Sequence, residues 1–298
     1  MRDVAGPQPK DAFVAHRGLL FTVAYEILGS AADAEDVLQE SWLRWSSVDR
    51  DDVRDPRAYL VRTVTRQSLN LLRTASRRRE EYVGPWLPEP LLTTPDVADD
   101  VVLAESVSVA MLTVLETLGP TERAVFVLRE VFDVPFDEIA DAVGKTPAAV
   151  RQIAHRARDH VAARRPRVAV DASEHDLAVQ RFIAVMNSGD VQGLMDVLAP
   201  DVVSVTDSGG LVRHAARRPL HGADRVVAFL QGSITKLDMA FAVIPLRVNG
   251  MLAAGIQVGG ALLAAVSFTV EDGRITQVFS VANPGKLSGL DAEAPLAR

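Results

Sequence analysis

The stretch PFDEIADAVGKTPAAVRQIAHRAR, residues 135–158, decides the fold of the central part of the chain. Two short amphipathic segments flank Gly144, and Thr146 followed by Pro147 is a typical beginning of a helix. The second segment has an apolar face that follows the helical period: Val150, Ile153, Ala154, Ala157 and Val161. Its opposite face carries Arg151, Gln152, His155, Arg156 and Arg158. The pattern predicts a helix-turn-helix whose second helix enters a DNA major groove.

An ordinary helical hairpin with a solvated basic face is the alternative reading of the same stretch. Residues 147–167 hold six Arg and one acidic residue, Asp159. Exposed helices usually mix both signs of charge, whereas contacts to phosphates need one sign. The charge pattern therefore favours DNA binding.

The composition bounds the other classes of function. The 298 residues are enough for two or three domains, and the formal net charge is −7. No cysteine is present, which excludes disulfides, thiolate zinc sites and a cysteine nucleophile. The six histidines form no metal-ligand spacing, so we expect no metal and no cofactor.

The sequence also bears on membranes and location. The polar beginning lacks a secretory pattern, which together with the missing cysteines indicates a cytoplasmic protein. Residues 251–270 carry no charge and are long enough to span a bilayer. Gly259 and Gly260 interrupt them, so two strands joined at a turn are the better interpretation, and no membrane partner is expected.

The chain divides into helical and mixed parts. Apolar stripes predict helices near 20–28, 31–45 and 56–78, and a proline-rich linker follows. Residues 97–165 are helical again, and the later part has helices followed by β-rich runs that predict an antiparallel sheet. We expect domains at 1–80, 97–165 and 171–290, with the linker at 81–96. The predicted fold class is two all-α domains followed by an α+β domain.

Two faces of the first domain are candidates for binding. The predicted helix at 33–45 groups Asp36, Gln39, Glu40 and Leu43 on one side, either as a solvated acidic face or as a protein-docking patch. Residues 54–79 hold eight Arg and one Asp. Arg62, Arg66, Arg73 and the run Arg77-Arg78-Arg79 are expected to follow phosphates, and Arg66, Gln67 and Asn70 to read exposed bases. The alternative is a helix that is simply basic.

The order of these features resembles that of a bacterial extracytoplasmic-function sigma factor of the sigma-70 family. The resemblance implies that DAEDVLQESWLRW (33–45) binds core RNA polymerase and that the basic helix opens and reads the −10 element of promoter DNA. It implies that Arg151, Gln152, His155 and Arg156 read the −35 element. Asn70 stands where many members of the family carry an acidic residue.

Three further motifs resemble the subgroup that carries an extra C-terminal SnoaL-like domain, a cone-shaped sheet wrapped by helices. The linker holds WLPEPL, and the resemblance assigns Trp86, Leu87, Pro88 and Glu89 an interdomain regulatory role. The same role falls on Asp207, Gly209 and Gly210 in DSGG, where Ser208 replaces a glycine, and on Asn283, Pro284 and Lys286 in NPGKL. The resemblance implies that this domain regulates the sigma factor in cis.

Two other functions stay open. SnoaL-like folds also occur in cyclases, isomerases and hydratases, and their pockets suit a small apolar ligand. The candidate polar residues for such chemistry are Asp207, His214 and His221, and no pattern shows that they converge. We therefore expect no enzyme. The alternatives to a sigma factor are a DNA-binding regulator that needs no polymerase, and a ligand-binding or enzymatic domain fused to a DNA-binding module.

Overall fold

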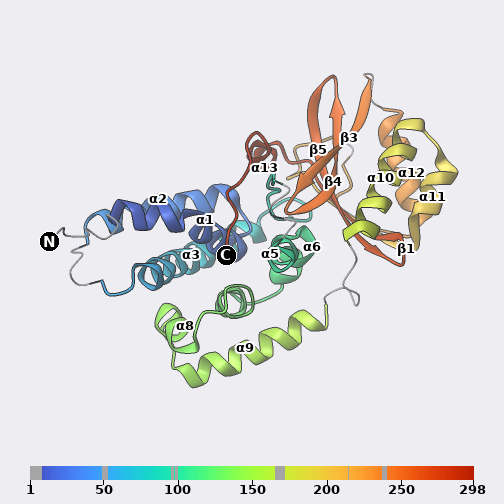
Figure 1. Cartoon of the computed structure of the whole chain (residues 1–298). Helices are drawn as coiled ribbons and strands as arrows, with labels where there is room; N and C mark the ends of the chain where they lie inside the picture. The colour runs from blue at the N-terminus through green and yellow to red at the C-terminus, as the bar shows by residue number, and fades with distance from the viewer. Residues whose placement is uncertain are drawn as a thin grey trace. The chain divides into compact units, whose positions relative to one another are not determined.

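The computed structural model describes residues 9–48, 53–94, 97, 100–164, 172–213, 215–236 and 240–298. They form two compact units. Figure 1 shows their helices and strands, coloured by residue number. Unit 1 comprises the described parts of Met1–Arg78, Val114–Arg164 and Pro295–Arg298. Unit 2 comprises those of Arg79–Thr113 and Arg165–Ala294, so the linker belongs to the same unit as the C-terminal domain.

Unit 1 begins with three helices: α1 (Pro9–Leu28), α2 (Ala31–Ser46) and α3 (Pro56–Glu80). The predicted apolar stripe of α1 is fully buried: Leu20, Val23, Ala24, Ile27 and Leu28. Gly29 ends the helix at φ 68°, a conformation that glycine adopts without a steric penalty. The Arg17 guanidinium forms two hydrogen bonds to the Glu35 carboxylate, of 2.7 and 2.9 Å, which join α1 to α2.

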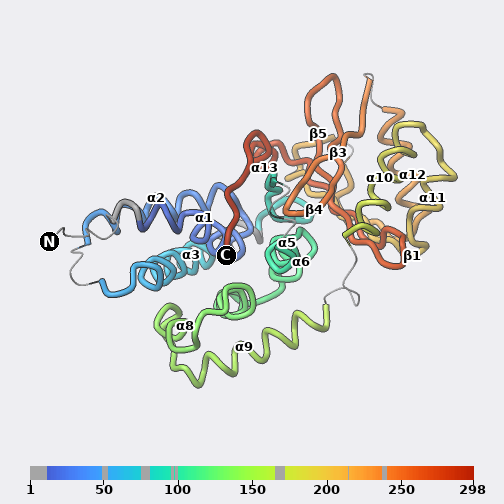
Figure 2. Tube along the Cα trace, viewed as in Figure 1, coloured from blue at the N-terminus to red at the C-terminus, as the bar shows by residue number. Residues whose placement is uncertain are grey.

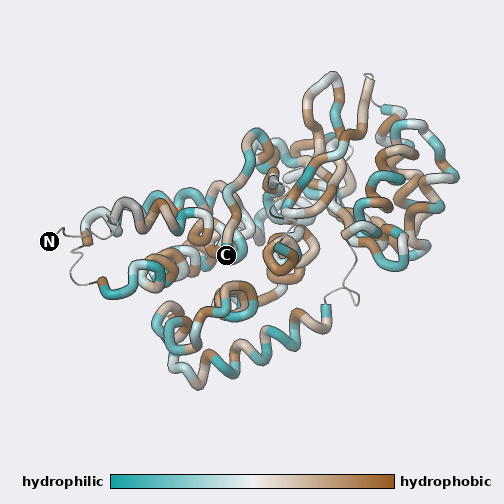
Figure 3. The backbone as a smooth tube through the Cα atoms, in the orientation of Figure 1, coloured by the Kyte–Doolittle hydropathy of each residue, from teal (hydrophilic) through white to brown (hydrophobic). Residues whose placement is uncertain are grey.

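The second part of unit 1 contains α7 (Pro120–Phe126), the π-helical turn η2 (Val127–Val131), α8 (Phe136–Val143) and α9 (Pro147–Ala162). The predicted helix-turn-helix is confirmed, with Gly144 at φ 67° in the turn and Thr146 capping α9. The predicted inward residues of α9 are all buried. Figure 3 shows hydrophilic and hydrophobic residues alternating along this helix, as expected for an amphipathic element.

Unit 2 is built on one six-stranded sheet in the order β2-β1-β6-β5-β4-β3. Its helices α10 (Ala172–Ser188), α11 (Val191–Val197) and α12 (Ala223–Ile234) pack against the sheet (Figures 1 and 2). The strands are β1 (Leu198–Asp207), β2 (Leu220–His221), β3 (Phe241–Val248), β4 (Met251–Val258), β5 (Ala261–Glu271) and β6 (Arg274–Val281). Phe182 of α10 and Phe268 of β5, with ring centroids 4.8 Å apart, lie in the core between these layers.

The expected fold class is confirmed, and one detail of it is wrong. The sheet is mixed, because β1 and β6 pair in parallel from Leu198–Ile275 to Asp207–Val281. Between β1 and β6 the chain forms β2, which is antiparallel to β1, then α12, and then β3, β4 and β5, which lead into β6 through antiparallel pairs. Sequence periodicity carries no information on this direction.

The uncharged stretch at 251–270 is two strands, as predicted. Strands β4 and β5 pair in antiparallel fashion across Gly259 and Gly260, which have φ of 58° and 85°. Among the described residues no helix is long and apolar enough to cross a membrane. Beyond β6 the chain forms two short helices, α13 (Pro284–Leu287) and η3 (Ser288–Leu290).

Candidate functional site

The exposed face of α9 carries the four residues predicted to read DNA. Arg151, Gln152, His155 and Arg156 are all exposed, whereas the apolar residues on the opposite face of α9 are buried. Nδ1 of His155 lies 2.9 Å from a carboxylate oxygen of Asp159. The neighbouring Arg158 is instead held by Glu130 at 2.7 Å. The four predicted side chains thus lie on one solvent-facing surface, with Arg158 committed to an ion pair beside them.

The described side chains of the basic helix α3 are only partly open to solvent, and those of the predicted run Arg77-Arg78-Arg79 lie outside the description. Asn70 and Arg73 are exposed, and a guanidinium nitrogen of Arg73 lies 3.5 Å from the Asn70 amide oxygen. Arg62 is half-buried and lies over the Tyr59 ring, 5.5 Å from its centroid. Gln67 is buried, so the expectation that it reads bases is wrong for this conformation. The helical period turns Gln67 inward beside the buried Val64 and Leu60.

Arg66 has partners that the sequence did not predict. Its guanidinium donates to the backbone oxygen of Asp141 at 2.6 Å and to that of Ala142 at 3.4 Å, in the last turn of α8. The carbonyls at a helix C-terminus carry a partial negative charge that attracts cations. A cleft of about 370 Å³ lies beside this contact and is lined by Arg62, Glu138 and Asp141, among others. In this conformation, α3 therefore binds the helix-turn-helix with a residue predicted to bind DNA.

A buried arginine that the sequence analysis missed lies in the same unit. Arg123 of α7 is 1% exposed, donates from Nε to the backbone oxygen of Glu26 at 2.7 Å, and pairs with the Glu116 carboxylate. A buried cation is stable only with partners of this kind. Arg123 thereby joins α7 to α1, and nothing in its local sequence marked it as a buried residue.

The predicted docking patch on α2 is an open surface. Asp36, Gln39 and Glu40 are exposed, and Leu43 is 66% exposed. The only ion pair that involves this patch among the described residues joins Glu40 to Arg44 at 2.7 Å. An exposed leucine beside acidic residues is what a protein-docking surface requires.

In unit 2 the linker packs on the C-terminal domain. Leu87 and Leu91 are 1% and 2% exposed, and Pro88 and Pro90 are buried as well. Leu87 packs in a cluster with Val109, Phe279 and Val281. Trp86 and Glu89 are half-buried. The leucines of WLPEPL are therefore buried within unit 2, where Leu87 packs on strand β6 of the C-terminal domain.

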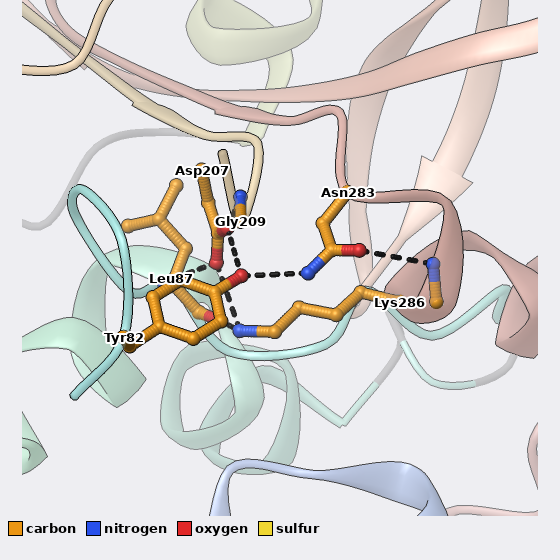
Figure 4. Close-up of polar contacts among 7 residues, drawn as sticks. Tyr82, Leu87, Asp207, Gly209, Asn283 and Lys286 are labelled. Atoms are coloured by element: carbon orange, nitrogen blue, oxygen red, sulfur yellow. Dashed lines mark hydrogen bonds and ion pairs between the residues drawn. The ribbon is translucent and has the colours of Figure 1, made fainter. Parts of the chain in front are cut away.

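Asp207 is the centre of the contact between linker and domain, as Figure 4 shows. Its carboxylate is fully buried at the end of β1. One oxygen accepts hydrogen bonds from the Leu87 amide and the Lys286 ammonium, both at 2.8 Å. The other accepts from the Tyr82 hydroxyl at 2.5 Å and the Gly209 amide at 3.2 Å. We call Tyr82, Leu87, Asp207, Gly209, Asn283 and Lys286 the linker-docking site.

Lys286 supplies the positive charge of the linker-docking site. Its ammonium also donates to the backbone oxygen of Leu87 at 2.5 Å and lies 3.7 Å from the centroid of the Trp86 ring. The ring face of a tryptophan attracts a cation most strongly when water is excluded. One lysine thus binds the backbone and the side chain of the linker and neutralises the buried carboxylate.

Asn283 and Tyr82 complete the hydrogen bonding of this site. The Asn283 amide donates to the Tyr82 hydroxyl at 2.6 Å, and its oxygen accepts from the Gly285 amide, which caps α13. Burial, with the hydrogen bond to Asp207, raises the pKa of the Tyr82 phenol well above its usual value. Tyr82 therefore stays a protonated donor to Asp207 throughout the physiological range. Tyr82 lies within the predicted linker, and no motif in the sequence indicated a role for it.

Steric constraints explain why the DSGG motif has glycine at positions 209 and 210. Gly209 and Gly210 have φ of 57° and 74°, and a Cβ on Gly209 would lie 2.7 Å from the Asn283 amide nitrogen. Ser208 is not among the described residues with positive φ. The serine that replaces a glycine of the related motif therefore has a backbone conformation that does not require glycine.

A second contact binds the end of the linker through Asn249, which lies in the β3–β4 turn. Its side-chain oxygen accepts from the Leu91 amide at 2.9 Å, and its side-chain nitrogen donates to the Val107 oxygen at 2.8 Å. The hydroxyl of Thr93 accepts from the Gly250 amide at 2.9 Å. The pair Asn249-Gly250 is a recognised hairpin signal, but its role in holding the linker follows only from the fold.

The candidate residues for catalysis do not converge in the described structure. Asp207 is occupied by the hydrogen bonds given above. His221 is exposed and pairs in register with Val203, four residues or about 13 Å from Asp207 along β1. His214 lies outside the described residues. Among those described, no group of three His, Asp or Glu is placed to hold a metal ion.

Comparison with known proteins agrees with this architecture. The sequence matches sigma-70 region 2 over residues 12–78, sigma-70 region 4 over 108–161 and the SnoaL-like domain over 179–278. It is 40% identical to the ECF RNA polymerase sigma factor SigJ of Mycobacterium tuberculosis, over 93% of this chain and 92% of that protein. It is 32% identical to the probable ECF RNA polymerase sigma factor SigI of the same species, over 95% and 96%. The crystal structure of SigJ superposes with a TM-score of 0.76 at 36% identity, over 95% of this chain and 99% of that one.

Proposed function

Because the chain belongs to the extracytoplasmic-function sigma factors, we propose that it directs promoter-specific initiation by core RNA polymerase and that its C-terminal domain controls this activity through the linker. The observation that carries the second part is the linker-docking site. In it, Asp207 and Lys286 bind the backbone of Leu87 from two sides. Such a protein acts in the cytoplasm, where the polymerase is.

We propose a role for each group of candidate residues from the surface on which it lies. The exposed patch of Asp36, Gln39, Glu40 and Leu43 on α2 would bind the polymerase, with Leu43 as its apolar anchor. The α9 face would grip the −35 element. Arg62, Arg66, Asn70 and Arg73 on α3 would engage the −10 element after Arg66 leaves the carbonyls of α8.

The contact between α3 and α8 is a closed state in this proposal. The centres of the −10 and −35 elements are about 25 base pairs apart, or roughly 85 Å of duplex. Arg66 of α3 lies within hydrogen-bond distance of α8, the first helix of the helix-turn-helix. In this conformation α3 and the helix-turn-helix therefore cannot engage the −10 and −35 elements at once. Initiation therefore requires α3 and the helix-turn-helix to separate.

The linker sets how far they can separate. Its sixteen residues, 81–96, supply at most about 55 Å of this separation when fully extended, and the chain between the linker and α8 supplies the rest. When Leu87, Leu91 and Thr93 are bound to the C-terminal domain, that reach is not available. The docked linker thus restricts the spacing of the two promoter-reading parts, and its release would extend it.

We assign no covalent chemistry to the C-terminal domain, because its buried carboxylate at Asp207 already has four hydrogen-bond donors. A small ligand that acts by loosening the linker would be compatible with the proposal. Its binding is an expectation from the SnoaL-like fold alone.

Run-off transcription tests the proposal. Core polymerase with the full chain on fragmented genomic DNA should start at specific sites. The Arg151→Ala/Arg156→Ala variant, folded as the unaltered chain, should lose most of these starts. Sequence-specific DNA binding by the chain, with no starts and no binding to core polymerase, would instead indicate the polymerase-independent regulator.

The closed state has its own test, which uses the absence of cysteine in the chain. Ala58 and Glu138 line the same cleft, so cysteines introduced at both positions can be joined by a reducible bismaleimide. The joined chain should lose run-off activity and regain it after reduction, while the Ala58→Cys chain treated in the same way keeps its activity. A joined chain that remains fully active would contradict the closed state.

A further inference from the structure

The segment after Asp207 carries a cluster of arginines that the functions described so far do not use. In residues 171–290 the acidic residues outnumber Lys and Arg by 11 to 9, yet four of these nine lie between 213 and 225. Asp224 is the single acidic residue in that interval. The four are Arg213, Arg217, Arg218 and Arg225, and all are exposed. We call Arg213, Arg217 and Arg218 the arginine loop.

The arginine loop has no partner of opposite charge in the described part of the chain. No ion pair or side-chain hydrogen bond joins any of its three guanidinium groups to a described residue. Some exposed arginines elsewhere in the described structure are paired, such as Arg44 with Glu40 and Arg158 with Glu130, but those of the arginine loop are not. A surface of one sign with free guanidinium groups suits phosphates, which arginine binds through two parallel hydrogen bonds.

The linker residues beside this loop follow closely after the basic helix in the chain. The backbone oxygen of Arg217 lies 3.9 Å from where a side chain on Gly84 would begin, and Val83 packs against Gly210. Gly84 follows Glu80, the last residue of α3, by four residues, so the chain keeps the two within about 14 Å. The arginine loop thus lies beside a part of the linker that begins only a few residues after the helix proposed to hold the −10 element.

From these observations we propose that the arginine loop binds the phosphate backbone of duplex DNA beside the segment held by α3. The C-terminal domain then contributes directly to promoter binding, in addition to holding the linker. This contact is independent of base sequence, because guanidinium groups on phosphates position a protein without reading bases. It goes beyond the proposed function, which assigns DNA binding to α3 and α9 alone.

Salt dependence measures this contact. Anisotropy of a labelled 30-base-pair duplex of arbitrary sequence gives the binding constant of the full chain across a KCl series. The plot of log K against log salt has a negative slope, and each lost phosphate contact makes this slope shallower by about 0.9. The variant Arg213→Gln/Arg217→Gln/Arg218→Gln should have a slope shallower by about 2.7.

A matched control separates the loop from net charge. Arg181, Lys236 and Arg274 are exposed in the same unit outside the loop, and changing all three to Gln removes the same charge. This control should keep the slope of the unaltered chain. Equal slopes for the loop variant and the unaltered chain, or equal losses in loop variant and control, would overturn the proposal. So would a loop variant that binds DNA normally and core polymerase poorly.

Proximity to DNA gives a second readout in the initiation complex. Because the chain has no cysteine, an iron chelate can be attached at Ala216→Cys in the loop alone, or at Leu177→Cys on α10 as a control. Cleavage of promoter DNA beside the −10 element is expected from position 216 and not from 177. Initiation at normal sites without cleavage from 216 would refute the loop contact and leave the sigma function intact.

Discussion

The linker-docking site predicts a large effect for the substitution Lys286→Met. Methionine keeps much of the length and the apolar stem of lysine but removes the ammonium. The Asp207 carboxylate then stays fully buried with no opposite charge, and the backbone oxygen of Leu87 loses its donor. Leu87 therefore loses one of the two groups that hold its backbone.

The magnitude follows from the burial of the pair. Asp207 is fully buried and the Lys286 side chain is 8% exposed. Removing one partner of a buried ion pair costs about 3–5 kcal/mol, because the other charge is left uncompensated. At 1.36 kcal/mol per tenfold change, the equilibrium for linker docking should fall by at least about 100-fold.

Hydrogen–deuterium exchange of the full chain reports this change locally. The Leu87 amide is buried and donates to Asp207 at 2.8 Å, so it exchanges only when the linker opens. Peptides covering residues 85–92 should exchange about 100-fold faster in Lys286→Met. The exposed Lys236→Met should leave them unchanged, which separates the site from a general loss of charge.

A second substitution tests the stated cause. Asp207→Asn in the Lys286→Met chain removes the uncompensated charge, so the double variant should recover part of the protection at 85–92. Unchanged exchange in folded Lys286→Met would refute the reasoning, since the ion pair would then contribute nothing to docking.

Three further outcomes are expected. Gly209→Ala should lower the stability of unit 2 by about 1–3 kcal/mol in urea unfolding, because φ is 57° and the new Cβ meets Asn283, while Ser208→Ala changes it little. Burial lowers the pKa of His175, so below about pH 6.5 the unfolded chain takes up a proton that the folded chain does not. The stability of the folded state should therefore fall by up to about 1.4 kcal/mol per pH unit in this range. Calorimetry from about pH 7.5 to 5 should find a weaker pH dependence in His175→Gln. Arg123→Met should destabilise unit 1 by about 3–5 kcal/mol in thermal unfolding, whereas Arg44→Met, which breaks the exposed pair with Glu40, should cost less than about 1 kcal/mol.

Local sequence was sufficient for most of the secondary structure. The cap at Thr146, the turn at Gly144 and the period of α9 are interactions between residues at most four positions apart. The β4–β5 hairpin depends in the same way on Gly259 and Gly260. Such patterns can be predicted because the partners are neighbours in the chain.

The motifs of the linker-docking site were visible in the sequence, but their chemistry was not. Asp207 reads as an ordinary turn former before two glycines. Its carboxylate acquires a different role because it meets Leu87 and Lys286, which lie 120 and 79 positions away. Tyr82 and Asn283 are 201 positions apart and share one hydrogen bond.

The sequence by itself determined the helices, the helix-turn-helix and the order of the domains, because backbone propensities and hydrophobic periods act over a few residues. The tertiary structure alone decided that β1 and β6 run in parallel, that Arg66 binds the carbonyls of α8, and that Gln67 is buried. These features depend on which distant surfaces meet. That choice is made by the burial of whole elements, which no local pattern records.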